Sequence, residues 1–466
     1  MEENKTREYC LNCKIKPCSN KGCPLNNDIP AFIHQTDYKK AFEILSRTTV
    51  FPAICGRICP HEKQCQGSCI RGIKGEPVSI GNMETYIGDI SIKENWTISK
   101  FDLDDVNSWI HTDIKENMTK KSSDTDFLNN TDYENYTPNI TEQQYKMLST
   151  KKVAVIGAGP AGLTCSAFLA RCGVQVTIYE KHSELGGILT HGIPEFRLNK
   201  TIVEATINKI LKLGVQVELN KELGKNISLE ELQAKYDAIF VSIGANIPAK
   251  MNIQGENLKG VFGGNSLLEN NSHPSYIGKN VAVIGGGNVA MDSARTIKRM
   301  GAEKVYVIYR RAEEQMPAEK KEIEAAKNEG IEFLFKTNIV KILGKLPEKQ
   351  EVINEFGEVG QIECIKTQLV KKEGETRLSP VNIEGSNYFM DVDYVVIATG
   401  SKPEEEVIKD FEHNKWGYIE VNENMQTSIP KVFAGGDIAG EKATVAWASR
   451  SGRNAAANII KTITRI

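Results

Sequence analysis

The chain has 466 residues, of which 40% are hydrophobic and 25% are charged, ordinary values for a soluble globular protein. This length predicts about three domains, and a formal net charge of −2 gives no reason to expect nucleic acid or an anionic membrane as a partner. No apolar run approaches the ~18 residues that a spanning helix needs, and the segment 1–6 lacks the apolar region of a secretory signal. We therefore expect a cytoplasmic protein.

Eight of the eleven cysteines lie between Cys10 and Cys69. They form the patterns Cys-x2-Cys-x4-Cys-x4-Cys-Pro and Cys-x3-Cys-Pro-x4-Cys-x3-Cys. Thiolates held this close by short loops can bind iron–sulfur clusters, and the Cys-Pro ends resemble the bacterial ferredoxin pattern. Structural zinc is the alternative, with His61 as a further ligand, although only Cys10 and Cys13 show the usual zinc spacing. Counting alone divides the eight cysteines into two sets of four.

The cysteine-rich segment is expected to be helical between its clusters, because apolar residues at 31–33 and 41–45 have the spacing of short amphipathic helices. We place this domain at 1–92. The stretch 93–150 is rich in Asn, Thr, Asp, Ser and Lys with little periodicity, which predicts a linker or insertion. Strand and helix patterns then alternate to the end of the chain, as in doubly wound α/β folds.

A dinucleotide-binding fingerprint follows the linker. A buried-strand pattern at 153–156 leads into the turn 157–162 and a helix at 163–171, and a second strand at 174–179 ends in an acid. In such a unit the glycines permit the tight turn, the approach of a pyrophosphate and close helix packing, while the acid accepts hydrogen bonds from a ribose. The residues expected to bind FAD here are Gly157, Gly159, Pro160, Ala161, Gly162 and Glu180.

A second fingerprint lies between a strand at 281–284 and a helix at 291–300. The following strand, 305–309, ends in two arginines where the first unit ends in an acid. An acid there would repel a 2′-phosphate, whereas a guanidinium can bind one, so this unit is expected to bind NADP(H). The alternative is that both arginines face solvent. The predicted contacts are Gly285, Gly287, Asn288, Val289, Ala290, Arg310 and Arg311.

The remaining segments complete the predicted flavin site. Asp437 follows a strand at 431–434 and precedes a small-residue helix from about 443 to 460, where it can hold the ribityl chain while the helix N-terminus stabilises a reduced flavin. The stretches 239–244 and 395–400 are interpreted as paired crossover strands between the nucleotide domains. The further cofactor-binding contacts expected are Gly187, Gly400, Gly436, Thr444 and Val445.

No redox-active dithiol accompanies the flavin fingerprint: the segment 185–197 has no cysteine, and Cys165 and Cys172 are interpreted as packing residues. The cysteine domain is therefore the expected exit for electrons that enter from the pyridine nucleotide. We predict an FAD domain in two parts, 151–277 and 401–466, with the NAD(P)H domain, 278–400, inserted between them. No protein side chain is predicted to be a catalytic residue.

The two cysteine runs, the sequence Gly-Ile-Pro-Glu-Phe-Arg at 192–197 and the segment 309–318 resemble the small subunit of bacterial NADPH-dependent glutamate synthase. They also resemble the large subunit of NADH-dependent ferredoxin:NADP oxidoreductase and the N-terminal half of dihydropyrimidine dehydrogenase. The resemblance covers nearly the whole chain outside 93–150. It implies a glutathione-reductase-like pair of Rossmann domains, for FAD and NADP, preceded by an α-helical iron–sulfur domain.

The resemblance also implies cluster ligands. One [4Fe–4S] cluster takes Cys10, Cys13, Cys18 and Cys69; the other takes Cys23, Cys59, Cys65 and, in place of Cys55, Glu84. The alternative for Glu84 is a solvent-facing helix residue.

Three functions remain open from the sequence. The first is an NADPH-oxidising electron-entry subunit that serves a larger glutamate synthase subunit. The second is the large subunit of an electron-bifurcating ferredoxin:NADP transhydrogenase, paired with a smaller FAD/[2Fe–2S] subunit and with ferredoxin. The third is a non-enzymatic zinc-binding docking scaffold.

Overall fold

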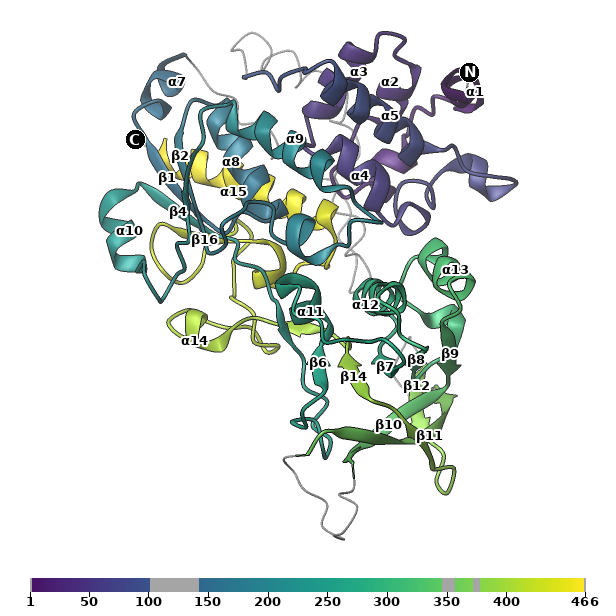
Figure 1. The fold of residues 1–466 in the computed structure, drawn as a ribbon. Helices are drawn as coiled ribbons and strands as arrows, with labels where there is room; N and C mark the ends of the chain where they lie inside the picture. The colour runs from purple at the N-terminus through teal and green to yellow at the C-terminus, as the bar shows by residue number, and fades with distance from the viewer. Residues whose placement is uncertain (1, 101–141, 346–356, 372–377, 465–466) are drawn as a thin grey trace. The chain divides into compact units, whose positions relative to one another are not determined.

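A computed structural model describes residues 2–100, 142–345, 357–371 and 378–464 (Figure 1). The chain divides into two compact units: residues 1–190, 195–244 and 405–466 form the first, and residues 191–194 and 245–404 form the second. Most of the predicted linker, 93–150, lies outside the described residues.

The first unit begins with the helical cysteine region. The predicted short helices are confirmed and accompanied by several others, and hydrophobic side chains such as Phe32 and Leu45 form their shared core. The helices are α1 (Glu2–Tyr9), η1 (Cys18–Gly22), α2 (Ile29–His34), α3 (Tyr38–Ser46), α4 (Pro52–Ile58), η2 (His61–Lys63), η3 (Ile70–Ile73) and α5 (Ile80–Lys93).

The same unit contains a five-stranded parallel sheet in the order β16-β4-β1-β2-β3. Its strands are β1 (Lys152–Ile156), β2 (Gln175–Glu180), β3 (Gln216–Leu219), β4 (Ala238–Val241) and β16 (Val432–Ala434). The helices and short turns of this region are α7 (Glu142–Leu148), α8 (Pro160–Arg171), η5 (Ile188–Gly192), α9 (Lys200–Leu211), α10 (Leu229–Lys235), α14 (Glu405–Ile408), η7 (Gly436–Ala439) and α15 (Val445–Ile463). Strand β16 joins the sheet almost 200 residues after β4, so the C-terminal segment completes the domain that the first fingerprint begins.

Helices α8 and α15 pack closely because small residues face each other. A Cβ atom at Gly452 would lie 2.1 Å from the carbonyl oxygen of Ala161. Hydrogen bonds connect this part of the unit to the helical cysteine region: the Arg171 guanidinium donates to the carbonyl oxygen of Ser46 at 2.6 Å, and the Lys209 ammonium donates to that of Ser91 at 2.6 Å.

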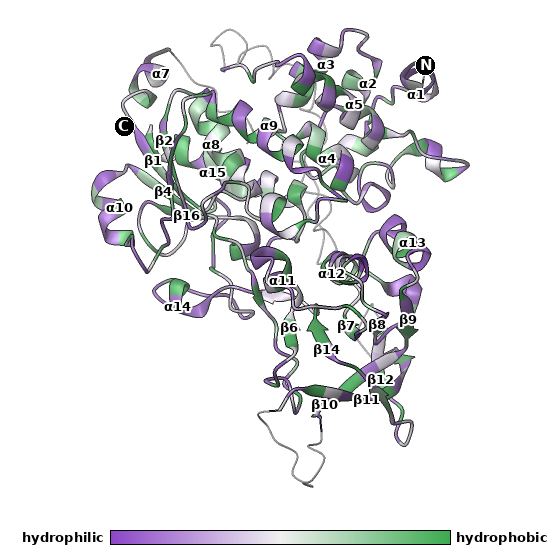
Figure 2. Ribbon diagram, in the orientation of Figure 1, coloured by the Kyte–Doolittle hydropathy of each residue, from purple (hydrophilic) through white to green (hydrophobic). Residues whose placement is uncertain are grey.

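The second unit has its own parallel sheet, in the order β6-β14-β7-β8-β9. Figure 2 shows the hydrophobic character of β14, whose residues lie between two neighbouring strands. The strands are β6 (Val261–Gly263), β7 (Asn280–Ile284), β8 (Lys304–Tyr309), β9 (Glu332–Phe335) and β14 (Tyr394–Ile397). The helices are α11 (Gly264–Asn270), α12 (Asn288–Arg299), η6 (Glu313–Gln315) and α13 (Lys320–Asn328).

An antiparallel sheet separates β9 from β14 along the chain. It consists of β10 (Thr337–Gly344), β11 (Val359–Val370), β12 (Ser379–Asn382) and β13 (Tyr388–Asp391). The stretches 239–244 and 395–400, interpreted as paired crossover strands, supply β4 and β14, which belong to different sheets. The antiparallel crossover pair comes directly after them, as β5 (Ile247–Pro248) and β15 (Ser401–Lys402).

None of the helices in the described ranges is long and apolar enough to cross a bilayer.

Candidate cofactor-binding sites

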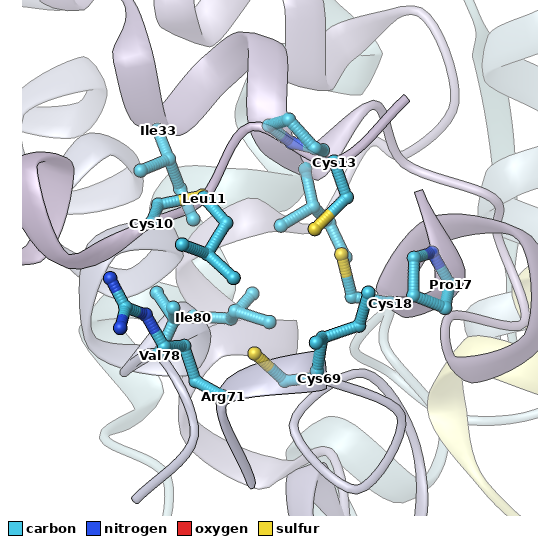
Figure 3. A pocket seen from close by; sticks show the side chains of 13 residues that line it. Cys10, Leu11, Cys13, Pro17, Cys18, Ile33, Cys69, Arg71, Val78 and Ile80 are labelled. Carbon is cyan, nitrogen blue, oxygen red and sulfur yellow. The ribbon is translucent and has the colours of Figure 1, made fainter. Parts of the chain in front are cut away.

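Four cysteines surround one cavity in the helical region. Cys10 follows α1, Cys13 lies in the next loop, Cys18 begins η1 and Cys69 directly precedes η3. Figure 3 shows the sulfur atoms of Cys13, Cys18 and Cys69 directed into the same space, with Ile33, Val78 and Ile80 among the apolar residues around it. The fold thus brings together the set that the resemblance implies for one cluster, although Cys69 is 59 residues from Cys10 in sequence.

Burial affects the protonation of these thiols. It raises the pKa of Cys10 and raises that of Cys18 to about 11, with the neighbouring thiol of Cys69 contributing to the latter. A metal ligand must be the thiolate, so cluster binding at this cavity is coupled to proton release.

A second group contains Cys23, Cys59, Cys65 and Glu84. Burial raises the pKa of Cys23 to about 12, and the Glu84 carboxylate and the Cys55 thiol add to this shift. Cys65 is buried and influenced by Cys23 and Glu84, and its pKa is well above the usual range. Cys59 hydrogen bonds with Cys55, which raises its pKa together with burial. Glu84 influences the pKa of Cys23, Cys59 and Cys65, and Cys55 influences that of Cys23 and Cys59, so both Cys55 and Glu84 are candidates for the fourth ligand.

Glu84 is not a solvent-facing helix residue. It lies in the second turn of α5 with 5% of its surface exposed, and burial raises its pKa to about 8. The amide of Asn27 donates a 3.2 Å hydrogen bond to its Oε1, which partly offsets that shift. A buried carboxyl group with one amide partner suits a site where a positively charged group is bound.

In the described ranges, no three His, Cys, Asp or Glu side chains lie close enough together to hold a single metal ion. Cys10, Cys13, Cys18 and Cys69 line one cavity, and cysteine thiolates are the usual ligands of iron–sulfur clusters.

The first fingerprint forms a turn between β1 and α8. Gly157 has φ +96°, a conformation that favours glycine, and a Cβ atom at Gly162 would lie 1.9 Å from the Gly157 carbonyl oxygen. Gly159 differs from both: no atom lies within 4 Å of the position its Cβ would take. An open approach to the backbone at the N-terminus of α8 is what a pyrophosphate needs.

Glu180 lies at the end of β2, as predicted, and is buried. Its carboxylate accepts hydrogen bonds from the backbone N–H groups of Ala158 at 2.7 Å and His182 at 3.0 Å. Glu180 therefore also fixes the glycine turn, a structural role that the fingerprint alone does not reveal.

The other predicted cofactor-binding residues come from several elements. Gly187 lies against Gly159, because its Cβ would be 2.9 Å from the Gly159 Cα. Pro160 and Ala161 begin α8; Gly436 and Asp437 begin η7; Thr444 caps α15 by accepting from the Trp447 N–H at 3.3 Å, and Val445 is that helix's first residue. Gly400 belongs to the second unit and follows β14. Burial, with Glu441 nearby, raises the pKa of Asp437 to about 6.

The second fingerprint has the same geometry in its own unit. Gly285 has φ +143°, and its Cβ would lie 2.3 Å from the Ala398 carbonyl oxygen and 3.5 Å from the Ala290 methyl group. Gly287 is open, with Pro317 Cγ at 3.9 Å as the nearest atom. Val289 packs near Gly264, and Asn288 is used structurally: its Oδ1 accepts from the Glu319 N–H at 3.1 Å.

The two arginines follow β8 as predicted. Arg310 is exposed, and Arg311 is half-buried. The Nε of Arg311 is buried without a hydrogen-bond partner among the described residues. A phosphate group would supply such a partner.

Two residues near the predicted sites were not identified from the sequence. Ser242, whose hydroxyl donates to the carbonyl oxygens of Ile156 and Gly157 at 3.0 Å, locks the first fingerprint from the neighbouring strand. Asn27 was not identified either, since only the fold places it against Glu84. The small residue after a buried strand could have suggested Ser242, whereas nothing local indicates Asn27.

Comparison with known proteins agrees with this layout. Residues 151–452 match the family described as pyridine nucleotide-disulphide oxidoreductase, and residues 2–96 match the family described as dihydropyrimidine dehydrogenase domain II, 4Fe-4S cluster. These matches support an oxidoreductase with FAD, NADP and iron–sulfur cofactors.

Two curated relatives extend the match. The glutamate synthase [NADPH] small chain of Escherichia coli (strain K12) is 32% identical over 97% of this chain and 90% of that one. The NADP(+)-dependent formate dehydrogenase subunit beta of Moorella thermoacetica is 33% identical over 95% of this chain. The chain spans 59% of that subunit, and 64% and 66% of two other relatives.

Among solved structures, FprA of Mycobacterium tuberculosis in complex with NADPH superimposes with a TM-score of 0.58 at 19% identity, covering 67% of this chain and 84% of that one. This likeness supports the fold.

Proposed function

Because the chain belongs to the pyridine nucleotide-disulphide oxidoreductases, and among them to the family of the glutamate synthase small chain, we propose that it is the electron-entry subunit of an NADPH-dependent glutamate synthase. The cavity lined by Cys10, Cys13, Cys18 and Cys69 carries this proposal. It lies in the same compact unit as the fingerprint with the open Gly159, so a flavin site and a thiol-lined site share one body of the protein.

FAD bound here would supply acceptance of a hydride from a nicotinamide nucleotide and one-electron transfer to iron–sulfur clusters. The open glycine Gly159 and the N-terminus of α8 bind the FAD pyrophosphate, and Asp437 orients the ribityl chain. The corresponding glycine Gly287 receives NADPH, and Arg310 and Arg311 bind its 2′-phosphate.

The cysteines hold two [4Fe–4S] clusters. Cys10, Cys13, Cys18 and Cys69 bind the first, and Cys23, Cys59, Cys65 and Glu84 bind the second. The burial of Glu84 and the hydrogen bond that it accepts from Asn27 favour a role as cluster ligand over that of a solvent-facing residue. Cys55 is then a buried neighbour that hydrogen bonds with Cys59.

A partner subunit would dock beside the first cluster. Large apolar side chains next to its ligands are exposed: Leu11 is 50% exposed, Ile15 71% and Ile73 76%. The segments 10–23 and 63–74, which contain these residues, carry six Lys or Arg residues and no Asp or Glu, while Lys16 pairs with Asp28 at 2.7 Å and Glu62 and Glu76 flank the second segment. An exposed apolar group within a basic region suits a partner with an acidic surface. We propose that this partner is the larger glutamate synthase subunit.

Anaerobic purification tests the cofactor content. Two clusters require about eight iron atoms and eight sulfides per chain, with one FAD. Glu84→Ala should reduce the iron content to about half, whereas Cys55→Ala should leave it unchanged; the reverse result would assign the fourth ligand to Cys55. Protein that contains zinc without iron or labile sulfide would contradict the proposal and favour a docking scaffold.

Co-purification of the native protein tests the partner. A larger subunit that converts 2-oxoglutarate and glutamine to glutamate with NADPH would support the proposal. Reduction of ferredoxin by NADPH that depends on NADH, with a smaller FAD/[2Fe–2S] subunit bound, would instead assign the chain to a bifurcating transhydrogenase.

A further inference from the structure

A buried guanidinium connects α15 to the second group of cluster ligands. Arg453 lies in α15 and has 0% of its surface exposed. Its Nη1 donates to two backbone carbonyl oxygens of the helical cysteine region, those of Leu25 and Thr48, both at 2.8 Å. Burying a permanent positive charge is costly, so this placement calls for a role beyond filling space.

One of these carbonyl groups belongs to the segment that contains Cys23, and the other belongs to Thr48, whose hydroxyl contacts Asn27. Leu25 is two residues after Cys23, and hydrogen bonds from the backbone of Asn27 and Leu25 reach the Cys23 thiol. Arg453 therefore binds, through the Leu25 carbonyl oxygen, the same loop whose backbone N–H groups contact the Cys23 thiol.

A chain of hydrogen bonds continues from Thr48 to the carboxyl group. The Thr48 hydroxyl donates to Asn27 Oδ1 at 2.7 Å, and Asn27 Nδ2 donates to Glu84 Oε1 at 3.2 Å. Arg453, Thr48, Asn27 and Glu84 therefore form a relay from α15 to α5. The helix that supplies Arg453 is the one whose first turn follows Asp437 and Thr444, at the flavin site.

A second buried arginine offers a contrast. Arg171, at the end of α8, is 2% exposed and also donates to carbonyl oxygens near the helical region, those of Ser46 at 2.6 Å and Ser99 at 2.9 Å. Ser46 is two residues from Thr48, but Arg171 does not share Arg453's contact with Leu25, which lies two residues after Cys23. Arg171 shares the burial, the charge and the connecting role of Arg453 without the relay.

We propose that Arg453 is a positioning residue for the second cluster: through Leu25, Thr48 and Asn27 it holds Cys23 and Glu84 in place, and its fixed positive charge favours the reduced cluster. This inference rests on the proposed function, since it requires Glu84 and Cys23 to be cluster ligands. The reduction potential of a cluster depends on the net charge and the hydrogen bonds around it. Here Arg453 would supply the charge, and Thr48 and Asn27 would supply the hydrogen bonds.

The test is an anaerobic redox titration of the full chain followed by electron paramagnetic resonance, in which the two clusters are resolved by their spectra. In Arg453→Met the ratio of reduced to oxidised second cluster at a fixed potential should fall about tenfold. For one electron this corresponds to a reduction potential lower by about 59 mV. Arg453→Lys keeps the charge and should restore the ratio to within about threefold of the unaltered protein.

Arg171→Met is the matched control. It should lower the melting temperature as Arg453→Met does, because both remove a buried connecting side chain, but it should leave the second cluster's ratio unchanged. An unshifted ratio in folded Arg453→Met, or an equal shift in Arg171→Met, would overturn the proposal.

Thr48→Val tests the relay if Arg453→Met does not accumulate, because it is isosteric and half-buried. It should lower the ratio a few-fold and alter the spectrum of the second cluster, whereas Thr48→Ser should do neither. No difference between these two variants would refute the relay. Iron analysis of the unaltered protein separates this failure from failure of the proposed function: a protein without a second cluster contradicts the function, and a protein with two clusters but no shift contradicts only the inference.

Discussion

Replacing one glycine by alanine in each fingerprint, and measuring which nucleotide then binds more weakly, tests the assignment of FAD to the first fingerprint and NADP(H) to the second. Gly159 has φ −72° and ψ −176°, and Gly287 has φ −92° and ψ 178°. Alanine adopts such extended conformations without strain. Because no atom lies within 4 Å of a Cβ at Gly159, and only Pro317 Cγ lies near one at Gly287, at 3.9 Å, Gly159→Ala and Gly287→Ala should both fold.

The cost should appear in ligand binding. A methyl group at Gly159 would occupy the space in front of the α8 N-terminus and separate the pyrophosphate from the backbone N–H groups. Losing about two charge-assisted hydrogen bonds, with partial readjustment, costs about 3 kcal/mol. This corresponds to about a hundredfold weaker binding of FAD. Stability without ligand should be unchanged or higher by about 0.5 kcal/mol, since alanine restricts the unfolded chain more than glycine does.

The assay is titration of FAD into deflavinated protein and of NADP+ into the flavin-loaded protein, with melting temperatures measured without ligand. Gly159→Ala should weaken FAD only, and Gly287→Ala should weaken NADP+ only. Exchanged effects would reverse the assignment of the two sites. Unchanged binding in Gly159→Ala, with an intact fold, would refute the reasoning that this opening receives the pyrophosphate.

Three further predictions concern the same sites. Gly162→Ala should destabilise the protein by several kcal/mol in thermal unfolding, because its Cβ would meet the Gly157 carbonyl oxygen at 1.9 Å; a stable variant would show that the turn can open. Arg310→Ala should raise the KM for NADPH about tenfold and leave that for NADH nearly unchanged, since Arg310 is exposed and contributes one charge-assisted contact; equal effects would contradict the 2′-phosphate role. Asp437 has a pKa raised to about 6 by burial, so its contribution to folding is present at acid pH and is lost as pH rises through about 6. The gain in the free energy of unfolding caused by Asp437→Asn in the flavin-free protein should therefore be about 2 kcal/mol larger at pH 8 than at pH 4. If denaturant unfolding gives the same gain at both pH values, Asp437 does not titrate with a raised pKa.

Features encoded within about thirty residues could be predicted from the sequence. Each fingerprint is a strand, a glycine turn, a helix and a second strand, and the periodicity and the glycines determine all four. The helices at 31–33 and 41–45 followed from the spacing of apolar residues. The helix expected from about 443 to 460 from its small residues corresponds to α15 (Val445–Ile463).

Contacts between distant segments could not be predicted in this way. The pairing of β16 with β4, the hydrogen bond between Asn27 and Glu84, and the contacts of Arg453 with Leu25 each join residues whose local sequences give no sign of one another. The interpretation of 239–244 and 395–400 as paired strands was wrong for the same reason: each segment fits a buried strand, and only the topology shows that β4 and β14 belong to different sheets.

The third small residue of each fingerprint shows how packing determines which residue a motif tolerates. At the first, Gly162 lies between the Gly157 carbonyl oxygen at 1.9 Å and the Ser242 hydroxyl at 2.7 Å from its Cβ position. The residue before it, Ala161, is covered by Gly452 of α15, so α8 has no freedom to move outward. At the second, the chain has Ala290, whose methyl group lies 3.5 Å from the Cβ position of Gly285, an ordinary contact.

Glycine is therefore required at the first fingerprint because a helix from the far end of the sequence packs on α8, and that same helix carries Arg453 to the cysteine region. The small residues of α15 let it pack on the first fingerprint, and Arg453 of the same helix contacts the cysteine region. We therefore expect Gly452→Ala to weaken FAD binding and to alter the proposed second cluster, whereas Gly159→Ala should weaken FAD binding alone.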